Sequence, residues 1–252
     1  MKKDLISLLD VRDDIFDLLS LASELKNERQ RNGRQLQGQT LAMIFEKSST
    51  RTRVSFETGM FQLGGNTIYL SQHDSQLGRG ETVADTARVL SRYVDGIIFR
   101  AFYHQNMLDL AKHSPVPVIN ALDNLEHPCQ VIADLLTIME KKKDLEGLKL
   151  AYIGDGNNVC NSLALGAALV GMDFVAATPK EYSPSTPIME KAVSIARTKG
   201  RTSECVIDPN VAARDADILY TDTWVSMGQE REAKRKEEVM RPYQINKAIM
   251  SL

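Results

Sequence analysis

Short apolar runs alternate with stretches of helical periodicity along most of the chain. The run Leu41 to Phe45 is typical of a buried strand, and the apolar positions from Val54 to Leu63 recur at helical spacing. The same alternation predicts further strands at 66–70, 96–99 and 116–121, and further helices at 11–25, 83–94, 104–112 and 131–139. Strands that alternate with helices in this way form βαβ units around a parallel sheet.

A polar break at 140–147 separates this series from a second one. The second series predicts strands at 148–153, 174–177 and 218–221, and helices at 161–170 and 188–197. We therefore expect an α/β fold of two similar domains, each a parallel β-sheet flanked by helices, spanning 1–140 and 141–252. Ligands of such sheets bind at the carboxyl ends of the strands, so the residues that follow each strand are the candidates for chemistry.

Composition excludes several classes of protein. The 31 Lys and Arg against 33 Asp and Glu give a net charge of −2, so no basic excess is available for nucleic acid. No run of about 18 apolar residues is present, and we expect no membrane partner. The cysteines, Cys129, Cys160 and Cys205, form no C-x-x-C pair, and the N-terminus has no signal-peptide pattern. Both features favour a cytoplasmic location.

Hydroxyl and guanidinium groups follow the first predicted strand. The segment E-K-S-S-T-R-T-R opens a helix there, and a helix N-terminus presents free N–H groups with partial positive charge. Ser49, Thr50, Arg51 and Thr52 would make a phosphate cradle at this position. The alternative is ordinary capping by Ser49 or Thr50, with solvated arginines.

Arg100 follows the strand at 96–99, at the same edge of the predicted sheet. An unpaired charge at the end of a buried strand is costly, which favours a ligand there. The alternative for Arg100 is a surface salt bridge.

The segment His127-Pro128-Cys129-Gln130 follows the strand at 116–121 and enters a helix. His127 has the chemistry to donate to a developing oxyanion, and Gln130 the chemistry to bind an amide. Cys129, at the helix start, is a candidate thiolate. A lone histidine is more often structural, and it is the convergence with the residues at 49–52 and Arg100 on one sheet edge that favours a catalytic interpretation.

The second series carries two polar segments. The segment G-D-G-N-N at 154–158 is a poor match to a dinucleotide fingerprint, because Val159 stands at the third glycine position. Its glycines indicate a tight turn, and Asn157 and Asn158 either cap the next helix or hold a polar small molecule.

The segment D-T-W-V-S-M-G at 222–228 follows the last predicted strand. Asp222 can hold an ammonium group, and backbone N–H groups around Ser226 and Met227 can bind a carboxylate, which together suit an amino acid. The alternative is a capped turn with a packed Trp224. The following residues, 229–238, are almost wholly charged and are expected to form a solvated helix or mobile loop.

Together these motifs resemble the aspartate/ornithine carbamoyltransferase family over nearly the whole chain. The resemblance implies transfer of a carbamoyl group from carbamoyl phosphate to an amine, with no metal or organic cofactor. It implies that carbamoyl phosphate is bound by Ser49, Thr50, Arg51, Thr52, Gln76, Arg100, His127 and Gln130. The catalytic residues implied within this set are Arg51, Thr52, Arg100 and His127.

The segments at 154–158 and 222–228 are similar to the ornithine branch of the family. The stretch 73–81 lacks the lysine of the aspartate branch and resembles the S-x-x-G loop, in which Gln76 reaches carbamoyl phosphate in a neighbouring subunit. The resemblance therefore implies L-ornithine as acceptor, L-citrulline and phosphate as products, and a homotrimer or a multiple of trimers. The implied ornithine-binding residues are Asn158, Asp222, Ser226 and Met227.

The sequence departs from the ornithine branch at one point. The branch carries an H-C-L-P motif and a further helix, whereas this sequence reaches Leu252 without either. We therefore expect the ornithine-binding domain to be C-terminally incomplete. The alternatives are a related carbamoyltransferase that acts on putrescine or an acylated ornithine, and a non-catalytic binding subunit.

Overall fold

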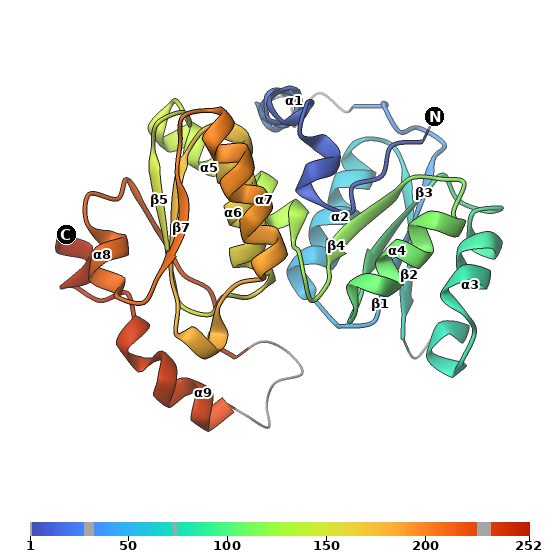
Figure 1. The fold of residues 1–252 in the computed structure, drawn as a ribbon. Coiled ribbons are helices and arrows are strands. Elements are labelled where there is room, and N and C mark those ends of the chain that lie inside the picture. Colours follow the sequence, from blue (N-terminus) through green and yellow to red (C-terminus); the bar gives the residue numbers. More distant parts are fainter. Residues whose placement is uncertain (1, 28–32, 73–74, 226–232) are drawn as a thin grey trace. The chain divides into compact units, whose positions relative to one another are not determined.

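The computed structural model describes residues 2–27, 33–72, 75–225 and 233–252 (Figure 1). The chain divides into two units, 1–129 and 130–252, and each contains a four-stranded sheet. Every strand pair within these sheets is parallel. The expected fold class, two α/β domains that each contain a parallel sheet flanked by helices, is confirmed. Among the described residues, no helix is long and apolar enough to cross a membrane.

The first unit has the strand order β2-β1-β3-β4. Its strands are β1 (Thr40–Phe45), β2 (Asn66–Ser71), β3 (Gly96–Arg100) and β4 (Val118–Leu122). Its helices are α1 (Ile15–Asn27), α2 (Thr50–Gln62), α3 (Val83–Leu90) and α4 (His104–His113), with short 3-10 helices η1 (Leu8–Val11) and η2 (Gln76–Arg79). The helix α5 (Pro128–Lys142) begins where the first unit ends and runs into the second. Each element predicted for this series is present, with shifted ends.

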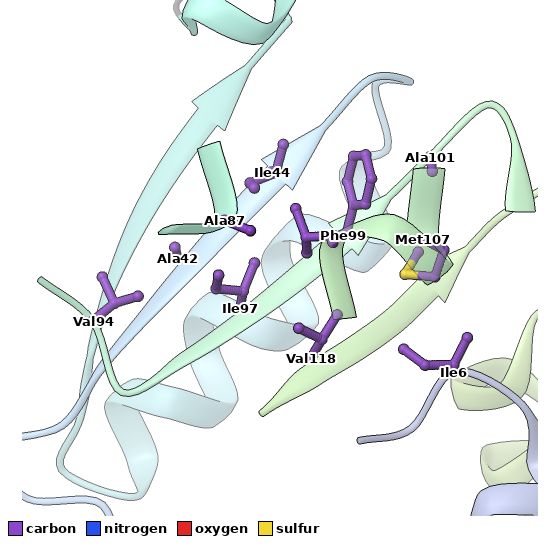
Figure 2. Packing of buried hydrophobic residues seen from close by; sticks show 11 residues of the cluster. Ile6, Ala42, Ile44, Ala87, Val94, Ile97, Phe99, Ala101, Met107 and Val118 are labelled. Carbon is purple, nitrogen blue, oxygen red and sulfur yellow. The ribbon is translucent and has the colours of Figure 1, made fainter. Parts of the chain in front are cut away.

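Both faces of the first sheet are covered at its inner strands β1 and β3, which explains why these two are continuous apolar runs. One face contributes Ala42 and Ile44 of β1 and Ile97 and Phe99 of β3 to a buried cluster (Figure 2). That cluster also holds Ala87 of α3 and Met107 and Leu110 of α4. The alternate residues of β1, Leu41, Met43 and Phe45, pack with Met60 of α2 on the other face. The alternation along β1 therefore places α2 on one side of the sheet and α3 and α4 on the other.

The register between β1 and β3 fixes the edge at which both strands end. Phe45 lies beside Arg100 across this pair, and the Glu46 N–H donates to the Arg100 carbonyl at 2.9 Å. The loop that leads into α2 therefore starts next to the end of β3. Segments far apart in the sequence are brought to one sheet edge by this pairing alone.

The second unit has the strand order β7-β6-β5-β8. Its strands are β5 (Lys149–Ile153), β6 (Asp173–Ala177), β7 (Ser203–Val206) and β8 (Ile218–Tyr220). Its helices are α6 (Asn158–Val170), α7 (Thr186–Thr198), α8 (Pro209–Ala213) and α9 (Ala233–Met240), with 3-10 helices η3 (Lys180–Tyr182), η5 (Arg241–Tyr243) and η6 (Ile249–Ser251). The pattern of the sequence did not predict β7 or α8. The first is an edge strand with exposed Glu204 and Cys205, and the second has only five residues.

The charged segment at 229–238 differs from its prediction. Its first residues lie outside the described part of the chain, and from Ala233 it forms the helix α9. Lys236 and Met240 of this helix are buried. A wholly solvated helix is therefore the wrong description, because two positions one turn apart face the interior of the second unit.

A substitution in the central strand β3 tests the packing of the hydrophobic core in the first unit. Phe99 is fully buried there, and Phe99→Ala should lower the free energy of unfolding by about 3–5 kcal/mol, because it removes a ring and leaves a cavity. Phe16→Ala on α1, where the ring is 51% exposed, is the matched control and should cost less than about 1 kcal/mol. Urea unfolding of both variants measures the difference, and equal losses would contradict the placement of Phe99.

Candidate active site

The N-terminus of α2 and the end of β3 bring three predicted residues together. Ser49 caps α2: its Oγ accepts the Thr52 N–H at 3.3 Å and donates to Thr52 Oγ1 at 3.0 Å. Arg100 Nη1 also donates to Thr52 Oγ1, at 3.4 Å. Since Thr52 Oγ1 accepts both bonds, the Thr52 hydroxyl keeps its own proton for a ligand. Thr50 and Arg51 occupy the first turn of α2 and are exposed.

Arg100 is buried, and no salt bridge joins it to a described carboxylate. It is 5% exposed, and its Nε has no hydrogen-bond partner among the described residues. Burial and the nearby Arg51 both lower the pKa of Arg100. A surface salt bridge, the alternative considered from the sequence, is therefore contradicted by the burial of this side chain. A guanidinium kept from water in this way is suited to bind an anion.

Lys47 adds a third cation to this edge. Burial and Arg100 lower the pKa of Lys47, against the opposing effects of Asp123 and Glu46. Its Nζ lies 4.8 Å from the centre of the Phe102 ring. Lys47 was not among the residues predicted from the sequence, although it stands just after the first strand in the segment that carries the predicted phosphate cradle.

The loop in front of His127 is held by a buried carboxylate. Asp123 Oδ1 accepts the N–H groups of Leu125 and Glu126 at 2.7 and 2.8 Å. Its Oδ2 accepts from Asn120 Nδ2 at 2.9 Å and lies 2.7 Å from His104 Nδ1. Asp123 therefore fixes the backbone that leads from β4 to α5, a role that the sequence analysis did not find.

His127 lies in this buried environment beside the cations. Burial, together with Arg100, lowers the pKa of His127 to about 4, while Asp123 acts in the opposite direction. The imidazole is therefore neutral at neutral pH. A neutral imidazole can still donate one hydrogen bond to an oxygen atom, and it does so without adding a further charge beside Arg100.

Three other residues predicted for the carboxyl edge of the first sheet, Gln130, Gln76 and Cys129, lie outside the hydrogen bonds around Arg100. Gln130 is exposed, and its Nε2 donates to Asp134 Oδ1 at 2.9 Å, which leaves its Oε1 as an acceptor. Gln76 is exposed at the start of η2 and takes no part in the hydrogen bonds around Arg100 that join described residues. Burial raises the pKa of Cys129 to about 12, and its Sγ donates to the Asn120 carbonyl. The thiolate hypothesis for Cys129 is therefore contradicted.

In the second unit, Asn157 caps a helix, which is one of the two roles that the sequence left open, and it also contacts a carboxylate. Its Oδ1 caps α6 by accepting the N–H groups of Val159 and Cys160 at 3.0 and 3.1 Å. Its Nδ2 donates to Asp222 Oδ2 at 2.8 Å. One amide thus fixes the start of a helix and orients a carboxylate at the end of β8. Asn158 is the first residue of α6, beside this link.

Asp222 lines a cavity of about 290 Å³ together with neighbouring residues. The other lining residues are Thr221, Thr223, Trp224, Gln244 and Ile245. Asp222 is half-buried, and among the described residues only Asn157 donates to its carboxylate. Ser226 and Met227, the other predicted residues of this half, lie outside the described residues.

The glycines at 154 and 156 make the tight turn that the sequence indicated. Gly154 has φ 143, a conformation that L side chains rarely adopt. A Cβ on Gly156 would lie 2.3 Å from the backbone nitrogen of Pro184. The turn therefore needs glycine for its conformation and for close packing.

Comparison with known proteins gives one consistent family. Residues 3–140 match the family described as aspartate/ornithine carbamoyltransferase, carbamoyl-P binding domain, and residues 146–252 match its Asp/Orn binding domain. An ornithine carbamoyltransferase of Picrophilus torridus is 52% identical over 249 residues, which are 99% of this chain and 82% of that protein.

Solved structures agree with these sequence matches. The ornithine carbamoyltransferase from Pyrococcus furiosus is 48% identical, with a TM-score of 0.94 over 99% of this chain and 80% of that one. The anabolic enzyme from Campylobacter jejuni is 45% identical, with a TM-score of 0.93 over 100% of this chain and 82% of that one.

The low pKa of His127 makes stability depend on pH in a predictable direction. Between about pH 4 and 6.5 the unfolded chain binds a proton that the folded protein does not, so this contribution is present above pH 6.5 and is lost as the pH falls towards 4. Between pH 7 and pH 4 the wild type should lose about 3 kcal/mol more than His127→Gln. Urea unfolding at the two pH values measures this, and parallel losses in both proteins would contradict it.

Proposed function

The chain belongs to the aspartate/ornithine carbamoyltransferase family, and from this membership and the site geometry we propose how its residues perform the reaction. The chain is a transferase that moves the carbamoyl group of carbamoyl phosphate to the side-chain amine of L-ornithine, giving L-citrulline and phosphate. We assign carbamoyl phosphate to the domain at 1–140 and ornithine to the domain at 141–252. The observation that carries the first assignment is the buried Arg100, which no described carboxylate neutralises, beside the capped start of α2.

The phosphate group is bound by the start of α2. Ser49, Thr50, Arg51 and Thr52 offer hydroxyls, N–H groups and a guanidinium around a helix N-terminus, where negative charge is favoured. Arg100 bridges the phosphate and the carbonyl oxygen of the carbamoyl group. This placement gives the Arg100 guanidinium a counter-charge that the described residues do not supply.

Negative charge develops on the carbonyl oxygen when the neutral amine attacks the carbonyl carbon. Thr52, Arg100 and His127 stabilise this oxygen, and a good donor in such a position contributes about 3–4 kcal/mol. The bond from carbon to the phosphate oxygen then breaks, and the phosphate leaves with its electron pair. The proton of the amine passes to solvent or to the phosphate. Gln130 orients the carbamoyl amide, because its Oε1 remains free to accept when Nε2 is held by Asp134.

Ornithine is bound through its α-amino and α-carboxylate groups. Asp222, oriented by Asn157, accepts the α-ammonium group together with Asn158. Ser226 and Met227 bind the α-carboxylate. The cavity beside Asp222 is lined by polar residues and by Trp224 and Ile245, a mixture that suits an amino acid with an aliphatic side chain.

We also propose self-association as a homotrimer or a multiple of trimers, in which Gln76 reaches the carbamoyl phosphate of a neighbouring copy. The exposed apolar side chains of α2 and β2, Val54, Phe61 and Ile68, support an interface on this side of the first unit. The cysteines are free thiols, which supports a reducing compartment such as the cytoplasm.

The direct test of the function compares acceptors. Purified protein with carbamoyl phosphate should form citrulline from L-ornithine, and putrescine and N-acetylornithine should give little product, because neither offers the free α-ammonium and α-carboxylate pair. Release of phosphate and of the carbamoylated amine is followed for each acceptor. Preference for putrescine or the acylated amine would contradict the ornithine assignment, and absence of product with every acceptor would contradict the proposed catalysis.

The phosphate site is tested by two arginines of one helix. Arg51→Ala should raise the KM for carbamoyl phosphate by roughly 10–100-fold, because it removes a charge-assisted hydrogen bond of about 1.5–3 kcal/mol. Arg53→Ala is the control, since Arg53 is paired with Glu57 at 2.9 Å and covers the Tyr69 ring at 3.8 Å. Arg51 is exposed, so thermal unfolding should not change. Near-normal kinetics in Arg51→Ala would contradict the site.

A further inference from the structure

A buried ion pair connects α9 to the turn after β5. Lys236 Nζ donates to Asp155 Oδ2 at 2.6 Å, and the two side chains are 2% and 7% exposed. The ammonium also lies 4.9 Å from the centre of the Tyr182 ring. Removing either partner would leave a buried charge without compensation, so this contact fixes where α9 and the turn meet.

The turn that Lys236 holds is the one that carries the ornithine-site amide. The Asp155 carbonyl accepts from the Tyr152 hydroxyl and from the Asn157 N–H, both at 2.7 Å. Asn157 in turn donates to Asp222 at 2.8 Å. A continuous series of short contacts thus runs from α9, through Asp155 and Asn157, to the carboxylate assigned to the α-ammonium group.

The same contact opposes the effect of a second carboxylate on Asp155. Burial raises the pKa of Asp155, Lys236 opposes that effect, and the charge of Asp222 adds to it. Lys236 therefore stabilises the charged form of Asp155 against both burial and the charge of Asp222. Without it, Asp155 would take up a proton or turn away, and the turn that orients Asn157 would change with it.

Resting on the ornithine site proposed above, we propose that Lys236 is a positioning residue for ornithine, which acts through Asp155 and Asn157 on Asp222 without touching the substrate. The sequence gives Lys236 no distinction from the charged residues around it. The structure distinguishes it by its burial and by its partner. Its adjacent residue, Arg235, pairs with Glu181 at 2.8 Å, but the Arg235 side chain is 74% exposed.

Steady-state kinetics of Lys236→Met test the proposal. The KM for ornithine should rise about tenfold or more, because a buried partner is lost, while the KM for carbamoyl phosphate should stay within about twofold. Arg235→Met is the matched control: it removes an ion pair between the same helix and η3 at an exposed position, and both KM values should stay within about twofold. Lys236→Met/Asp155→Asn should recover part of the ornithine KM, because the uncompensated carboxylate is gone.

The outcomes distinguish a role of Lys236 in positioning the ornithine site from a role in stabilising the fold alone. A lower melting temperature with an unchanged ornithine KM, or an equal rise in both KM values, would overturn the proposal. If Lys236→Met does not fold, Asp155→Asn breaks the same ion pair from its other side and carries the same test: a raised ornithine KM with an unchanged carbamoyl phosphate KM is expected, and two unchanged values overturn the proposal. Wild type assayed in parallel that forms no citrulline would overturn the proposed function and this inference with it.

Discussion

The burial of one guanidinium constrains the first unit. The parallel register of β1 and β3 places Arg100 at 5% exposure, and no described residue accepts from its Nε. A charge removed from water without a partner is unfavourable, and the pKa of Arg100 is lowered accordingly. An anion bound at the start of α2 would offset the cost of this buried charge, because it supplies both a negative charge and hydrogen-bond acceptors. The arrangement of Ser49, Thr52 and Lys47 around Arg100 is consistent with the proposed anion site.

Each unit holds its polar loops by a buried carboxylate at the carboxyl edge of its sheet. In the first unit Asp123 accepts from two backbone N–H groups and contacts His104, which fixes the approach to His127. In the second unit Asp155 accepts from Lys236 and lies in the turn that presents Asn157. The carboxylates make no proposed contact with substrate, yet the donors and acceptors that do are ordered through them. This is the way in which side chains on short loops gain the rigidity that a binding site requires.

Elements with a strong apolar pattern could be predicted from the sequence, and those without one could not. β1 and β3 are buried on both faces, so their apolar runs predicted strands correctly. β7 lies at a sheet edge with exposed Glu204 and Cys205, and its composition resembles that of a loop. The cluster of Ser49, Thr52 and Arg100 could be predicted from the sequence because each residue lies at the start or the end of an element. The role of Lys236 could not be predicted, since burial of a lysine within a charged segment depends on a partner that is distant in the sequence.

Burial lowers the pKa values of bases at the first candidate site and raises the pKa values of acids at the second. This difference indicates which ligand charge each site would accept. At the edge of the first sheet burial lowers the pKa values of bases, Lys47, Arg100 and His127, so positive charge is unfavourable there until an anion is present. In the second unit burial raises the pKa values of two acids, Asp134 and Asp155, and the charge of Asp222 raises both further, so a cation beside Asp222 would lower the cost of negative charge there. Carbamoyl phosphate brings negative charge, and the α-ammonium group of ornithine brings positive charge. Each ligand would therefore bring charge opposite to that of the residues assigned to bind it, and exchange of the two ligands between the units would place like charges together.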